Sequence, residues 1–90
     1  MESGQEIRAA REEEIRSFIT DNFMIGQNPA ELKNSTSFLD NGIVDSLGVL
    51  ELVSFIEEKF GIEVKDEELV PENLDSIDNL LTYIAKKQAE

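Results

Sequence analysis

Cysteine, histidine and tryptophan are all absent from this 90-residue sequence, and each absence removes a kind of chemistry. Without cysteine there are no disulfides, zinc–thiolate sites or cysteine nucleophiles, and without histidine the commonest general base and metal ligand is missing. A chain this short buries about 60% of its unfolded surface, which leaves little space for a deep catalytic cleft. We therefore expect one domain over residues 1–90, with flexible ends at 1–5 and 88–90. A self-contained catalyst would have to use carboxylates, hydroxyls and amines alone.

Basic residues are scarce as well. The sequence has 8 Lys and Arg against 20 Asp and Glu, a net charge of −12. Nucleic-acid phosphates and anionic lipids need Lys and Arg for their neutralisation, so we expect basic proteins as partners instead. Residues 39–78 contain 12 acidic and 2 basic residues, so a charge of −10 lies in this stretch. By itself such a block is compatible with a merely solvated, solubilising face.

Long hydrophobic runs are also missing. No stretch of about 20 apolar residues occurs, and residues 1–10 contain nothing like the apolar core of a signal peptide. These observations predict a cytoplasmic protein without membrane insertion. The hydrophobic content of 40% is nevertheless sufficient for a folded domain.

The apolar residues that are present recur at helical spacing. A first helix is predicted over residues 6–24, with an inner face made of Ile7, Ala10, Ile15, Phe18, Ile19 and Phe23. A long loop over residues 26–45 follows, and its apolar end indicates an ordered segment. A second helix is predicted from Asp45 or Ser46 to Phe60, with one apolar stripe formed by Val49, Leu52, Val53, Ile56 and Phe60.

The second half of the chain continues the pattern. Gly61 is typical of a left-handed residue that ends a helix. A short helical turn is predicted over residues 66–69, ending before Pro71, and Ser76 is a good N-cap for a last helix. The predicted fold is all-α: a small antiparallel bundle of three long helices plus one short helix, with a long loop between the first and second helices.

Two leucines do not belong to the apolar stripe of the second helix. Leu47 and Leu50 lie on another side of it, together with the polar residues Glu51, Ser54, Glu57 and Glu58. Apolar side chains surrounded by carboxylates form a suitable docking surface for a basic partner. The alternative is that both leucines pack under the long loop.

Ser46 lies where the second helix begins. Unpaired backbone N–H groups and the positive end of the helix dipole favour an anion there, by typically 0.3–1 kcal/mol. A phosphate joined to the Ser46 hydroxyl would be well placed. The simpler interpretation is that Asp45 or Ser46 is only an N-cap.

The stretch FLDNGIVDSLGVLEL at residues 38–52, followed by EEKFGIEV at residues 57–64, resembles the acyl carrier protein family around its phosphopantetheine attachment site. The resemblance covers about residues 6–87. It implies that 4′-phosphopantetheine is attached to Ser46. It also implies that the phosphopantetheinyl transferase and the synthases contact Asp45, Leu47, Leu50, Glu51, Ser54, Glu57 and Glu58. The site that holds an acyl chain would be lined by Val49, Leu52, Val53, Ile56, Tyr83 and Ile84.

The function implied by this resemblance is that of a monomeric, non-catalytic carrier. It would present acyl or aminoacyl thioesters to enzymes of fatty-acid, polyketide or specialised lipid and secondary-metabolite biosynthesis. Two features depart from fatty-acid carriers: Gly48 replaces an acidic residue and so removes one carboxylate from the docking face, and the run Gly-Ile-Val-Asp-Ser is similar to carriers of D-alanine and other amino acids.

Other interpretations of the same segment are weaker. Asp40 and Glu51 are spaced like the first and last ligands of an EF-hand calcium loop, but Gly42 and Val44 stand where further ligands are needed. We therefore expect no metal site. A carboxylate-based enzyme has no recognisable pair of acids, and an acidic protein-interaction domain without a prosthetic group remains the main alternative.

Overall fold

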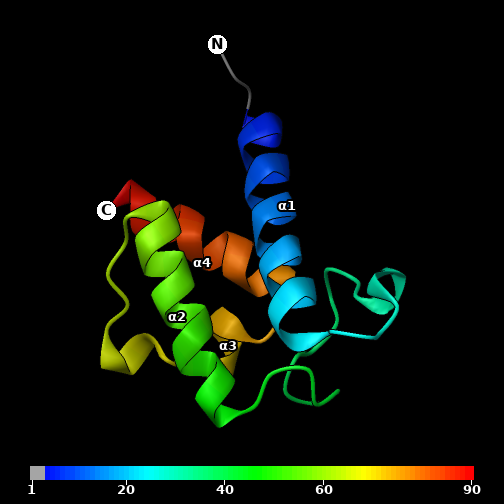
Figure 1. Cartoon of the computed structure of the whole chain (residues 1–90). Coiled ribbons are helices and arrows are strands. Elements are labelled where there is room, and N and C mark those ends of the chain that lie inside the picture. Colours follow the sequence, from blue (N-terminus) through cyan, green and yellow to red (C-terminus); the bar gives the residue numbers. More distant parts are fainter. Residues whose placement is uncertain (1–3) are drawn as a thin grey trace.

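Three long helices and one short helix make up the fold in the computed structural model, which describes residues 4–90 (Figure 1). Helix α1 (Gly4–Phe23) runs antiparallel beside α2 (Ser46–Phe60), and α4 (Ile77–Ala89) crosses behind them. The short helix α3 (Pro71–Leu74) leads into α4. No strand occurs among the described residues, so the all-α prediction is confirmed.

The ends of the chain were expected to be flexible. Of the residues concerned, 1–3 lie outside the described residues, whereas Gly4 begins α1 and Ala89 ends α4. Flexibility at 1–5 and 88–90 therefore stays a prediction.

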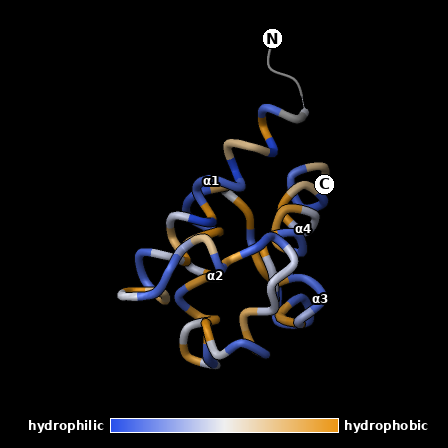
Figure 2. The backbone as a smooth tube through the Cα atoms, turned by 90° about the vertical axis from the view of Figure 1, so that its right-hand side faces the viewer, coloured by the Kyte–Doolittle hydropathy of each residue, from blue (hydrophilic) through white to orange (hydrophobic). Residues whose placement is uncertain are grey.

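The core lies where the three long helices meet. Hydrophobic and hydrophilic residues alternate along each of them, as expected for helices with one apolar side (Figure 2). The fully buried residues from these helices are Ile15, Ile19, Leu52, Ile56, Ile77, Leu80, Leu81 and Ile84. Between α1 and α2 the rings of Phe18 and Phe55 stack with centroids 4.1 Å apart. This contact fixes the two helices side by side.

The predicted inner face of α1 is correct only for its second half. Ile15 and Ile19 are buried, whereas Ile7 and Ala10 are exposed. The first turns of α1 extend beyond α2, and their apolar side chains stay exposed (Figure 1). Sequence periodicity marks an apolar side but does not show how far the neighbouring helices reach.

The segment between α2 and α4 also differs from the prediction. The predicted turn over residues 66–69 is present as a short 3₁₀ helix, η2 (Asp66–Glu68). A further short helix, α3, begins at Pro71, where the sequence was expected to leave the helix. Proline is favoured at the first position of a helix because it lacks the N–H that would stay unpaired there. Pro71 is therefore the first residue of α3 and does not merely follow the end of η2.

Contacts from α1 and from the link between α3 and α4 hold the long loop that joins α1 to α2. The loop contains a 3₁₀ helix, η1 (Pro29–Glu31), and buries Phe38 and Val44. The guanidinium of Arg16 in α1 donates to the backbone oxygen of Leu32. The carboxylate of Asp75, between α3 and α4, accepts the backbone N–H of Leu39 at 2.8 Å. The loop thus delivers the chain to the start of α2 in one defined position.

Candidate functional site

Ser46 is the first residue of α2, and its hydroxyl is free. The preceding residue, Asp45, is the N-cap, and its carboxylate accepts the backbone N–H of Gly48 at 2.7 Å. The side chain of Ser46 is exposed, and within residues 4–90 nothing forms a hydrogen bond with its hydroxyl. Of the two capping candidates, Asp45 is therefore the cap. An exposed hydroxyl at the positive end of a 15-residue helix suits the attachment of a phosphate ester.

The side of α2 next to Ser46 carries two exposed leucines. Leu47 is 74% exposed and Leu50 is 58% exposed, so the alternative that they pack under the long loop is wrong. Glu51, Ser54 and Glu58 are exposed as well. Their spacing of three and four residues places these side chains along one side of the helix. The structure therefore forms an apolar strip bordered by carboxylates, which we call the α2 face: Leu47, Leu50, Glu51, Ser54 and Glu58.

Glu57 differs from the other acidic residues predicted for this surface. Its side chain is half-buried, and its carboxylate accepts the backbone N–H of Val64 at 2.9 Å. Glu57 therefore links α2 to the segment that follows this helix in the sequence. Asp45 is exposed, but its carboxylate is used by the cap. By contrast, Glu51 and Glu58 have no hydrogen-bond or ion-pair partner in the described part of the chain.

Gly48 was expected to remove a carboxylate from the docking face, and this prediction is wrong. Gly48 is buried, and a β-carbon there would lie 2.9 Å from Cε1 of Phe23 and 3.0 Å from Cγ1 of Val44. The position faces the end of α1 rather than the α2 face. A larger side chain at residue 48 would first have to displace the ring of Phe23.

A small apolar cavity of about 80 Å³ lies beside the first turns of α2. One wall comes from the long loop and α2, and the other from the segment that contains α3. Its lining residues are Phe38, Leu39, Val44, Val49, Leu69, Val70, Pro71, Leu74 and Asp75. Of the residues predicted to contact an acyl chain, only Val49 belongs to this lining. Leu52, Ile56, Tyr83 and Ile84 are buried in the closed core, and Val53 is half-buried.

The wall formed by residues 69–74 was missed by the sequence reasoning. The sequence would have predicted this wall if Pro71 had been interpreted as the first residue of a helix, with Leu74 one turn later on the same helix. Residue periodicity in a four-residue helix is too short to indicate which side faces the interior.

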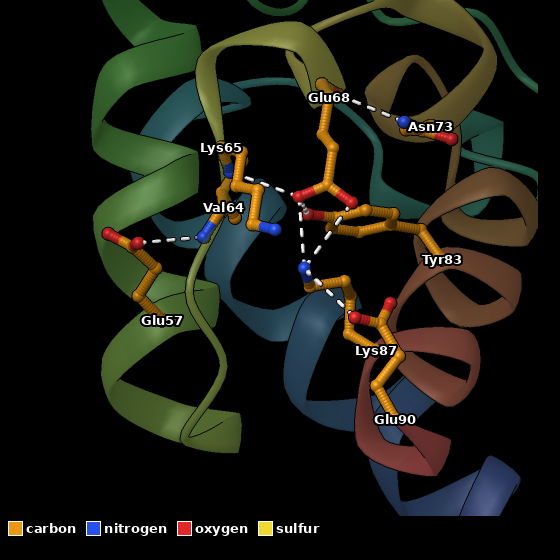
Figure 3. A network of polar contacts seen from close by, with 8 residues as sticks. All are labelled: Glu57, Val64, Lys65, Glu68, Asn73, Tyr83, Lys87 and Glu90. Carbon is orange, nitrogen blue, oxygen red and sulfur yellow. Dashed lines mark hydrogen bonds and ion pairs between the residues drawn. The ribbon is translucent and has the colours of Figure 1, made fainter.

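A polar network joins η2 to α4 (Figure 3). The carboxylate of Glu68 accepts the backbone N–H of Lys65 at 3.0 Å, the hydroxyl of Tyr83 at 3.1 Å and the ammonium of Lys87 at 3.0 Å. The Lys65 N–H and the Lys87 ammonium lower the pKa of Glu68. Burial, together with the contact to Glu68, raises the pKa of Tyr83, and the Glu68 carboxylate raises the pKa of Lys87.

Two further observations on the described residues concern metal binding and membrane spans. Residues 4–90 contain no group of three acidic or other ligating side chains that would hold a metal ion. In the same range, none of the helices combines the length and the apolar character needed to cross a bilayer.

Comparisons with known proteins connect this geometry to a family. The family described as "Phosphopantetheine attachment site" matches residues 13–84. The chain is 31% identical over 77 residues to an acyl carrier protein from Chlamydia muridarum, covering 86% of this chain and 95% of that one. It is 36% identical over 72 residues to an acyl carrier protein from Clostridium acetobutylicum, covering 80% and 88% of the two chains.

A solved structure has the same fold. The solution NMR structure of a holo acyl carrier protein from Nitrosomonas europaea superposes with a TM-score of 0.72 at 23% sequence identity. The match covers 89% of this chain and 98% of that one.

Proposed function

The chain belongs to the acyl carrier protein family, and we propose that Ser46 is the residue to which its 4′-phosphopantetheine is attached. The observation that carries this proposal is the division of roles at the start of α2. Asp45 caps the helix, so the exposed hydroxyl of Ser46 is left without a partner among residues 4–90. Ser46 also lies within the residues matched by the family.

As a member of this family the chain is a non-catalytic carrier of phosphopantetheine-linked acyl groups. The arm supplies the thiol on which cargo is held as a thioester, which accounts for a carrier that contains no cysteine. The residues of the chain itself position the serine, present a surface to enzymes and surround the cavity beside α2.

For the partners, we propose that the α2 face binds the phosphopantetheinyl transferase and the enzymes that load or use the cargo. Exposed Leu47 and Leu50 suit an apolar pocket, and unpaired Glu51 and Glu58 suit basic side chains around it. Asp45 lies next to this surface through its position beside Ser46. Glu57 contributes indirectly, because it holds Val64. We further propose that the carrier acts as a monomer in the cytoplasm.

For the cargo, we propose acyl chains of fatty-acid, polyketide or specialised lipid and secondary-metabolite biosynthesis. The support is the apolar cavity beside the first turns of α2, to which Val49 and Leu69 contribute. Ligand pockets usually measure about 300–1,000 Å³, so a cavity of about 80 Å³ must open before it holds a chain. We propose that the opened cavity also reaches the predicted contacts Leu52, Val53, Ile56, Tyr83 and Ile84. D-alanine or another aminoacyl group is the alternative cargo.

Co-expression with phosphopantetheinyl transferases tests the attachment. We expect the intact mass to increase by one phosphopantetheine and the substitution Ser46→Ala to abolish the increase. Ser17→Ala is the matched control, because Ser17 is also exposed on a helix but lies on α1, outside the α2 face, and its variant should still be modified. An unmodified wild-type chain with several transferases would contradict the proposal and favour a cofactor-free interaction domain.

A second measurement addresses the cargo. The modified protein is offered to acyltransferases and to amino-acid-adenylating ligases, and the loaded species is identified by mass. Loading with acyl groups supports the proposed cargo, whereas exclusive loading with an amino acid supports the aminoacyl alternative.

A further inference from the structure

Both polar contacts and partial apolar packing hold the segment that connects α2 to α3. We call residues 61–70 the connecting segment. Its apolar residues Ile62, Val64 and Val70 are only half-buried, and Leu69 is 38% exposed. At its start, the carboxylate of Glu57 accepts the backbone N–H of Val64 at 2.9 Å. Farther along, the main attachment to the rest of the fold is the carboxylate of Glu68.

Glu68 reaches across to α4 and forms what we call the Glu68 clamp, which consists of Glu68, Tyr83 and Lys87 (Figure 3). Tyr83 and Lys87 are four residues apart, so both point from one side of α4. The Lys87 side chain is 7% exposed and that of Glu68 is 20% exposed. The ion pairs Arg8–Asp78 and Lys59–Glu14 are about half-exposed at both ends. The ion pair of the clamp is therefore better shielded from water than these, and salt screens it less.

The clamp lies at one end of the wall formed by residues 69–74. Glu68 is followed directly by Leu69, Val70 and Pro71, all of which line the cavity. Leu69 is 38% exposed, whereas Phe38 and Val44 in the opposite wall are almost fully buried. We therefore expect an entering acyl chain to displace the wall at Leu69, next to the residue that the clamp holds.

We propose that the Glu68 clamp sets how readily residues 69–74 move outward, and so determines which acyl chains this carrier takes into its cavity. This inference rests on the proposed function, since it concerns the cargo of the Ser46 arm. Glu68 acts as a positioning residue, because it fixes the end of the wall at Leu69, and an acyl chain enters the cavity by pushing residues 69–74 outward. Weakening the clamp should therefore raise the fraction of acyl chains that lie inside the cavity.

The absence of cysteine allows a test that does not depend on any transferase. In the full chain, Ser46→Cys provides a single thiol, which is alkylated with an iodoacetyl-pantetheine analogue that ends in an octyl chain. A trifluoromethyl group at the end of the octyl chain gives separate ¹⁹F signals inside the cavity and in water. The ratio of the two signals measures the population inside. Failure of enzymatic modification at Ser46 would contradict the proposed function but leave this experiment intact.

The substitution Glu68→Gln keeps the size of the side chain and removes its charge. Hydrogen bonds to charged groups are stronger than neutral ones, so we expect the inside-to-outside ratio to rise by about fivefold. Amide hydrogen exchange at residues 69–74 should accelerate by a similar factor in the unlabelled chain. Lys87→Met removes the ammonium group that binds Glu68. It should likewise raise the inside-to-outside ratio and accelerate amide exchange at residues 69–74.

Glu67→Gln is the matched control, because Glu67 is exposed in the same 3₁₀ helix and has no partner within residues 4–90. It should leave the ratio and the exchange rates within about twofold of the wild type. The proposal is overturned if no variant shows an inside signal, if Glu68→Gln leaves the ratio unchanged, or if Glu67→Gln has the same effect. Equal acceleration of exchange at the buried residues Leu52 and Ile56 would also overturn it, because it would indicate a general loss of stability.

Discussion

The α2 face and the Glu68 clamp both depend on glutamates, but they use them in opposite ways. On the α2 face, the carboxylate of Glu58 is exposed and has no partner among the described residues. In the clamp, the carboxylate of Glu68 accepts hydrogen bonds from a backbone N–H, a phenol and an ammonium. A free carboxylate is available to a partner protein, whereas a satisfied one holds the fold together.

The comparison is sharpest within two Glu-Glu pairs. In the pair Glu57–Glu58 the first residue contacts Val64 and the second faces water. In the pair Glu67–Glu68 the second residue forms the clamp and the first faces water. Each pair thus divides one internal and one external role between neighbours. Net charge alone does not reveal this division.

The largest effect should come from the leucines of the α2 face. Leu47→Ala combined with Leu50→Ala should lower kcat/KM for modification by a phosphopantetheinyl transferase by roughly thirtyfold, because the loss of about 1 kcal/mol of binding from each leucine adds up to about 2 kcal/mol. The free energy of unfolding should change by less than about 0.5 kcal/mol, since both side chains are exposed. Steady-state kinetics and thermal unfolding check the two parts.

Leu52→Ala provides the contrast for this prediction. Leu52 is fully buried, so its truncation should lower the free energy of unfolding by about 2–5 kcal/mol. Unchanged kinetics in the double leucine variant would mean that the transferase binds elsewhere.

A smaller effect is expected from charge. The variant Glu51→Gln with Glu58→Gln should lower kcat/KM by about tenfold at low salt, because electrostatic steering raises encounter rates by roughly 10 to 10³-fold. High salt should remove most of the difference from the wild type, since it screens exposed charges. Rates measured across a range of ionic strengths test this. Glu57→Gln is the companion variant: it should alter thermal stability more than the salt dependence.

The smallest effect concerns acid. The pKa of Glu68 is lowered in the folded chain, so the clamp contributes stability above the ordinary glutamate pKa of 4.5 and loses it as the pH falls through the lowered value. Between pH 7 and pH 3 the wild type should therefore lose more thermal stability than Glu68→Gln. Glu67→Gln should behave like the wild type, and Tm measured across this pH range distinguishes them. If Glu68→Gln lost as much stability as Glu67→Gln, the clamp would not be a native-state contact.

The sequence predicts the long helices because their signals are local. Asp45 and Ser76 both cap the following helix through their side chains, and Gly61 adopts the expected left-handed conformation with φ of +65°. The exposure of Leu47 and Leu50 follows from helical spacing alone and is confirmed. Each of these features depends on residues within one or two turns.

Features that depend on distant parts of the chain were not predictable in this way. The exposure of Ile7 depends on where the neighbouring helices end, and the burial of Gly48 depends on Phe23 of α1. The clamp joins residues that are 15 and 19 positions apart in the sequence. No periodic pattern links Glu68 to Lys87, so the contact appears only once the helices are packed.

The cap at Asp45 has a consequence for how the carrier and its transferase meet. Because the carboxylate of Asp45 closes the first turn of α2, an ester at the neighbouring Ser46 removes no hydrogen bond from the described fold. If the arm is attached to Ser46 as proposed, we expect α2 to keep its cap when the arm is gained or lost. Attachment would then require no refolding of the helix, and a folded, unmodified carrier could accept the arm at any time.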